Sequence, residues 1–126
     1  MKLSTLLIIN AVVALTFALG CLLVPMQLLS FYGATTDAAG LLVTRYFGAA
    51  LGGISLLAWL ARKVADREAQ QAVILTLLVT WVLTLVVDLL GQFSGVLNAF
   101  SWSTVVLAIL FVAAFSYFLF LKPRTA

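Results

Sequence analysis

Residues 41–60, Leu41-Leu-Val-Thr-Arg-Tyr-Phe-Gly-Ala-Ala-Leu-Gly-Gly-Ile-Ser-Leu-Leu-Ala-Trp-Leu60, form a long apolar run with one arginine, Arg45, in its first third. Three more apolar runs occupy residues 3–24, 72–90 and 103–121. A helix of about 20 apolar residues crosses roughly 30 Å of hydrocarbon. No run alternates with the period of a strand, and backbone groups in lipid must be bonded within their own segment. The sequence therefore predicts an all-α, polytopic membrane protein, a bundle of four transmembrane helices.

The composition agrees with a membrane protein. Of the 126 residues, 65% are hydrophobic and 9% are charged, whereas soluble domains have roughly 25% charged residues. We expect a single domain, residues 1–126, with helices at about 3–24, 37–62, 71–91 and 102–121. Pro25 should end the first helix, and residues 26–33 should form a short helix at the membrane interface. Thr35 or Thr36 is the expected N-cap of the second helix.

The positive charges predict the orientation in the membrane. Six of the seven cations fall on one side of the predicted bundle, and the opposite loops carry no lysine or arginine. By the positive-inside rule, both termini should lie in the cytoplasm. The cations form no long basic run, so we expect no nucleic-acid partner. The six are Lys2, Arg62, Lys63, Arg67, Lys122 and Arg124.

Small residues accompany the arginine of the second helix. Gly48 and Gly52 form a GxxxG pattern. Arg45, Gly48, Gly52 and Ser55 recur at spacings of three and four, so we expect all four on one face of the helix. Faces of small residues let helix backbones approach closely. We therefore expect Gly48, Gly52 and Ser55 to mediate helix packing, either inside the bundle or against a second copy of the chain.

Polar residues also occur in the first and third helices. Asn10 has a predicted depth similar to that of Ser55, so the two are candidate partners across a helix interface. In the third helix, Thr76, Thr80 and Thr84 recur every four residues. Threonines in membrane helices commonly donate to their own i−4 carbonyl oxygens, so most of this row should be structurally silent.

Asp88 continues the row and is the most informative acid of the chain. Arg45 precedes Arg62 by 17 residues and Asp88 follows Gln71 by 17, which places both about 25 Å along their helices. Each opposes the dipole of its own helix. We expect an ion pair between Arg45 and Asp88 that faces the bundle interior near the outer surface. Alternatively, each side chain extends separately to the outer headgroups.

The run from Arg45 to Gly53, Arg-Tyr-Phe-Gly-Ala-Ala-Leu-Gly-Gly, together with the predicted four helices, resembles the loose DoxX-like group of small bacterial membrane proteins. The resemblance covers the whole chain in architecture and the second helix in residues. Some DoxX relatives are accessory subunits of quinone-linked oxidoreductases, so the resemblance implies an accessory role in the inner membrane of a bacterium.

Two functional hypotheses remain. No histidine is present and no catalytic set of residues can be assembled, so we expect no enzyme activity, metal site or cofactor. In the first hypothesis, the protein is an accessory or structural subunit that packs through its second helix, in a homo-oligomer or a larger complex. In the second, Arg45, with Asp88, Asn10 and Thr84, lines a cavity for a lipid, a quinone or an anionic solute.

A charge exchange tests the predicted pair. Either Arg45→Asp or Asp88→Arg alone should lower the thermal stability of the detergent-extracted protein, because each leaves two like charges facing each other. The double variant should recover most of that loss. A double variant no more stable than the single variants would contradict the pairing.

Overall fold

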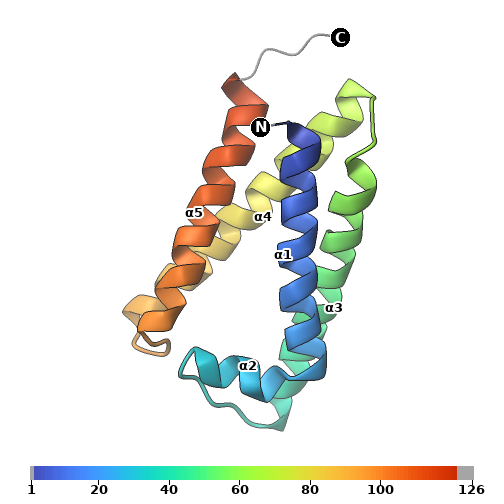
Figure 1. Cartoon of the computed structure of the whole chain (residues 1–126). Coiled ribbons are helices and arrows are strands. Elements are labelled where there is room, and N and C mark those ends of the chain that lie inside the picture. The colour runs from blue at the N-terminus through green and yellow to red at the C-terminus, as the bar shows by residue number, and fades with distance from the viewer. Residues whose placement is uncertain (1, 122–126) are drawn as a thin grey trace. The chain divides into compact units, whose positions relative to one another are not determined.

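The computed structural model describes residues 2–121, which are helical and contain no strand (Figure 1). Four segments of this part are long and apolar enough to cross a membrane, which indicates a multi-pass membrane protein. The chain divides into two compact units, Met1–Lys63 and Val64–Ala126, which are described separately. Packing of all four helices in a single bundle stays a prediction. The helices are α1 (Leu3–Leu23), α2 (Pro25–Phe31), α3 (Ala38–Ala61), α4 (Arg67–Phe93) and α5 (Trp102–Ser116), with a 3-10 turn η1 (Ala99–Ser101) and a π-helical turn η2 (Tyr117–Leu121).

In the first unit, α1 and α3 lie antiparallel along most of their length (Figure 1). Pro25 has no N–H to continue α1, and it begins α2 instead. The predicted short helix is thus present, while its position at the membrane interface stays a prediction. Gly33 follows α2 with a φ of 74°, a conformation that costs glycine little. The chain can therefore turn there toward α3.

The N-terminus of α3 differs from the expectation. Asp37, rather than Thr35 or Thr36, is the N-cap, and its Oδ1 accepts a hydrogen bond of 2.9 Å from the Gly40 N–H. A carboxylate here also interacts favourably with the positive end of the helix dipole. The N-cap therefore follows the two threonines in the chain and lies directly before α3.

The N-terminus of α4 also differs, since this helix begins at Arg67 and not near residue 71. The Asp66 carboxylate caps it by accepting from the Ala69 N–H at 3.0 Å. The Gln70 side chain donates back to the Val64 carbonyl oxygen at 2.6 Å. The first turn is polar, so a search for apolar runs misses it, although its capping residues are plain in the sequence.

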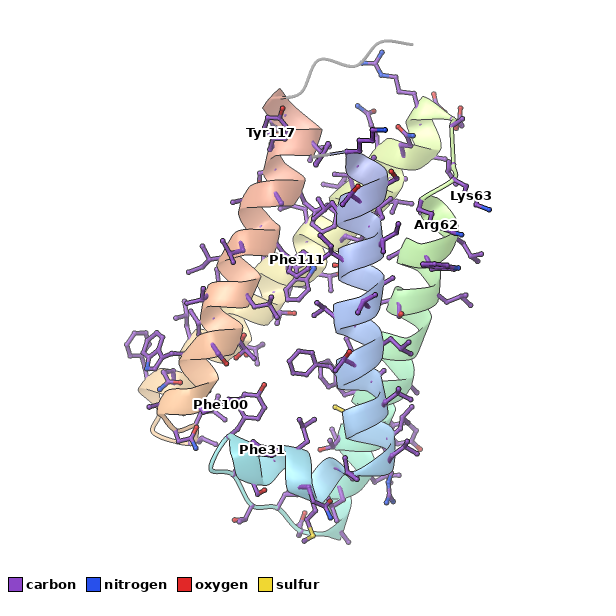
Figure 2. All side chains as sticks on the ribbon, in the orientation of Figure 1. Phe31, Arg62, Lys63, Phe100, Phe111 and Tyr117 are labelled. Atoms are coloured by element: carbon purple, nitrogen blue, oxygen red, sulfur yellow. The ribbon has the colours of Figure 1, made fainter. Side chains whose placement is uncertain are left out.

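The second unit pairs α4 with α5 through aromatic side chains. The Trp81 and Phe111 rings stack with centroids 4.3 Å apart and an interplanar angle of 5°. Phe115, one turn further along α5, continues the stack at 6.1 Å from Phe111. Figure 2 shows Phe111 on α5. Aromatic pairs of this kind contribute roughly 0.5–1.5 kcal/mol beyond the area they bury.

A polar turn closes the α4–α5 hairpin. The Ser101 side chain is 1% exposed; its hydroxyl donates to the Asn98 carbonyl oxygen at 2.8 Å and contacts the Gln92 side-chain oxygen. The Gln92 amide donates to the same Asn98 carbonyl oxygen at 3.3 Å. These bonds hold the end of α4 to the start of η1.

Gly48 sets the distance between α1 and α3. A methyl group on Gly48 would lie 2.8 Å from the Cys21 Cβ and 3.1 Å from the Ala18 carbonyl oxygen. Real Cβ atoms do not approach this closely, so a hydrogen is the only side chain that this helix spacing accepts. A methyl group on Gly52, one turn later, would meet no atom within 4 Å.

This contrast predicts opposite effects for two identical substitutions. Gly48→Ala should destabilise the detergent-solubilised protein by about 1–3 kcal/mol, because it overpacks the α1–α3 contact. Gly52→Ala should be neutral or slightly stabilising, since alanine has the higher helix propensity. Thermal or denaturant unfolding of both variants checks the prediction. Equal effects would show that Gly48 does not control the contact.

Candidate functional site

The polar groups of the first unit meet between α1 and α3. The Ser55 hydroxyl donates to the Ala11 carbonyl oxygen at 2.7 Å, in a buried position. Asn10, the residue before Ala11, is 0% exposed. Asn10 was the predicted partner of Ser55. Ser55 instead donates to the backbone of Ala11, the next residue of α1. This is a direct hydrogen bond between two candidate membrane spans.

The small residues of α3 do not all face α1. Gly48 and Ser55 are buried and seven residues apart, so they lie on nearly the same line along the helix. Gly52 is turned from Gly48 by roughly 40° and Arg45 by roughly 60°, both to the same side, at about 3.6 residues per turn. Arg45 is exposed and Gly52 is only partly buried. The predicted single face is thus two surfaces. Gly48 and Ser55 pack against α1, whereas Arg45 and Gly52 lie to one side of that contact.

We call this second surface the Arg45 flank and define it as Arg45, Ala49 and Gly52. Ala49 is exposed, like Arg45. No other acid than Asp37 occurs among residues 2–63, and Asp37 caps the N-terminus of α3 through Gly40. The first unit therefore supplies no spare carboxylate to neutralise Arg45.

The threonine row of α4 behaves as expected. Thr76 donates to the Ala72 carbonyl oxygen at 2.7 Å, Thr80 to Thr76 at 2.8 Å and Thr84 to Thr80 at 2.8 Å. The hydroxyl protons of these threonines are thus used inside their own helix. Thr84 keeps acceptor capacity only, which narrows what it could offer a ligand.

Asp88 contrasts with the threonines of the same row. It is partly buried, and its Oδ2 is a buried atom with no hydrogen-bond partner among residues 2–121. Asp88 belongs to the second unit and Arg45 to the first, so their pairing stays a prediction. Within the described residues, no group of three or more cysteine and acidic side chains could hold a metal ion.

Arg62 makes two contacts that the sequence did not predict. The Arg62 guanidinium carbon lies 3.8 Å from the centroid of the Trp59 ring, and Nη1 donates to the Trp59 carbonyl oxygen at 2.7 Å. Their spacing of three residues places both side chains on one side of a helix, which is the signal that could have found the contact. Figure 2 shows Arg62 and Lys63 together at the end of α3.

The Ser55 hydrogen bond joins two helices and the Thr84 hydrogen bond lies within one, so their removal should lower the stability by different amounts. Ser55→Ala should lower the free energy of unfolding by about 0.6–1.7 kcal/mol, which runs from the average to the largest value for hydrogen bonds between membrane helices. Thr84→Ala should change it little, because its bond lies within one helix. Unfolding in mixed micelles measures both. A Thr84→Ala loss as large as that of Ser55→Ala would indicate that Thr84 also contacts another segment.

A family model described as a domain of unknown function (DUF8292) matches residues 1–120. No curated protein and no solved structure matches the chain. The description of the family assigns no activity, so the function has to be argued from the residues of this chain. Because the match spans most of the 126 residues, the chain belongs to the DUF8292 family.

Proposed function

We propose that this member of the DUF8292 family is an accessory or structural subunit of the bacterial inner membrane that packs against a partner protein through the Arg45 flank. The observation that carries the proposal is the open space at Gly52, where an added methyl group would meet nothing within 4 Å. Membrane helices use small residues where another helix approaches closely. The resemblance to the DoxX-like group, through the run from Arg45 to Gly53, supports the same role.

The charge of the first unit supports an orientation with cytoplasmic termini. Lys2 precedes α1, and Arg62 and Lys63 follow α3, so the antiparallel pair carries these cations at one end. Asp37 lies at the opposite end. This asymmetry is what the positive-inside rule requires of a cytoplasmic end. Lys122 and Arg124, which entered the same prediction, lie outside the described residues.

Asp88 supports a second candidate function, a small binding or transport module. Ionisable groups inside a membrane are costly and commonly mark a pathway for an ion or substrate. The buried, unpartnered Oδ2 of Asp88 could accept a donor from a ligand. In this alternative, Arg45, Asp88, Asn10 and Thr84 bind a lipid, a quinone or an anionic solute near the outer face.

Native mass spectrometry of gently extracted protein separates the two functions. A co-purifying protein, or a second copy of the chain, supports the subunit. A retained small molecule, lost in Asp88→Asn, supports the binding module. A bare monomer without either would contradict both proposals.

Two leucine substitutions locate the partner surface. Gly52→Leu should abolish co-purification, because the bulky side chain fills the space that the partner backbone needs. Ala50→Leu is the matched control, because Ala50 is exposed and lies roughly 160° around α3 from Gly52. It should leave the complex intact. Loss of the partner in both variants, or in neither, would exclude the Arg45 flank as the interface.

A further inference from the structure

The C-terminal end of α3 combines an exposed aromatic ring with a cation held in place. Trp59 is 43% exposed. The Arg62 guanidinium lies over its ring at 3.8 Å and donates to the Trp59 carbonyl oxygen at 2.7 Å. These two contacts restrain a side chain that otherwise has large rotamer entropy. A ligand that binds this guanidinium therefore meets a group that is already ordered.

The same guanidinium keeps most of its hydrogen-bonding capacity. A guanidinium carries five N–H donors. Among residues 2–121, the Arg62 guanidinium donates one hydrogen bond, to the Trp59 carbonyl oxygen. The remaining donors form a planar group suited to two oxygen atoms of a phosphate. Stacking on an aromatic face leaves the edge that carries these donors free.

The surroundings select for negative charge. Lys63 is the next residue and is exposed, and Figure 2 shows it beside Arg62 at the end of α3. The antiparallel packing of α1 on α3 brings Lys2 to the same end of the unit. Asp37, the one acid within residues 2–63, is at the far end of the unit. Asp66 and Glu68 follow Arg62 closely in the chain, but residues 62–68 also hold Arg62, Lys63 and Arg67, so three cations against two acids leave this stretch with a net charge of +1, to which Lys2 adds.

The depth matches a lipid headgroup. α3 has 24 residues and is long enough to cross the hydrocarbon, so its last turn reaches the membrane surface. Tryptophan is enriched at the level of the headgroups, where its ring lies in the interface. The phosphates of the bilayer lie at this level. A soluble phosphate compound would gain nothing from the membrane-facing ring, whereas a lipid packs its glycerol and upper chain against it.

We propose that Trp59, Arg62 and Lys63 form a binding site for the phosphate of an anionic phospholipid headgroup. Arg62 binds the phosphate oxygens, Trp59 fixes the guanidinium and packs against the lipid, and Lys63 adds charge. Zwitterionic lipids bind more weakly, because their own cation offsets the phosphate. The site is independent of the Arg45 flank and of any protein partner.

The test uses the full chain in nanodiscs that contain equal amounts of phosphatidylglycerol and phosphatidylcholine. Native mass spectrometry then counts the lipids retained on the ejected protein. The wild-type chain should retain phosphatidylglycerol preferentially. Arg62→Gln should reduce this preference roughly five-fold, the effect of about 1 kcal/mol per basic residue at an anionic surface. Trp102→Leu, which removes a similarly exposed tryptophan at the start of α5, should leave the preference unchanged.

Further measurements make the result decisive. Trp59→Leu keeps every charge and should still weaken the preference; it decides the matter if Arg62→Gln loses its helical circular dichroism. Millimolar inorganic phosphate should not displace the lipid. The proposal is overturned by a wild-type chain without preference, by an unaffected Arg62→Gln or Trp59→Leu, by equal losses in Trp59→Leu and Trp102→Leu, or by displacement with inorganic phosphate.

Discussion

Hydrocarbon offers the backbone no hydrogen-bond partner, and this constraint governs the chain from Leu3 onward. Each unsatisfied N–H or C=O would cost several kcal/mol in lipid, so the apolar segments form continuous helices. The helices are interrupted where a side chain can bond to the backbone N–H groups, or where a residue has no N–H to satisfy. Pro25 lacks the N–H that α1 would have to satisfy, and Asp37 and Asp66 accept from the N–H groups that open α3 and α4. The starts of α2, α3 and α4 therefore coincide with residues that either lack a backbone N–H or accept a hydrogen bond from one.

The same constraint sorts the polar side chains of the helices into three kinds. Thr76, Thr80 and Thr84 return their protons to their own helix and so contribute little to association. Ser55 donates to the backbone of α1 and joins two helices. Arg45, by contrast, carries a charge for which its unit holds no spare counter-charge. Function is best sought among residues of this last kind, because packing alone does not account for them.

Hydropathy in the sequence was enough to predict the four apolar helices, since their length and composition are imposed by the membrane. It could not find the first turn of α4, because Arg67 and Glu68 are polar and only the Asp66 cap reveals that turn. Nor could it separate Phe111, which stacks on Trp81, from aromatic residues that face outward. Contacts between helices depend on rotation about each axis, which hydropathy does not report.

Rotation also explains why the candidate site was only partly predictable. Spacings of three and four placed Arg45, Gly48, Gly52 and Ser55 on one face, but a helix contact line is narrower than such a face. Gly48 and Ser55 lie on that line, while the Arg45 flank turns away from it. Arg45 is accordingly exposed, whereas Gly48 is buried against α1.

The two arginines of α3 show what an arginine needs near a membrane. Arg62 ends the helix, where the dipole favours a cation, and it uses Trp59 for both a ring contact and a carbonyl acceptor. Arg45 lies about 10 Å from the N-terminus, where the dipole opposes it. At the centre of a membrane helix an arginine costs roughly 2.5–3.5 kcal/mol by the lowest scale, and this cost falls toward the helix end, where the long side chain can reach the interface. Since the one carboxylate within residues 2–63, Asp37, caps the N-terminus of α3, what offsets the cost of Arg45 is best sought outside α1–α3, in a headgroup, the second unit or a partner.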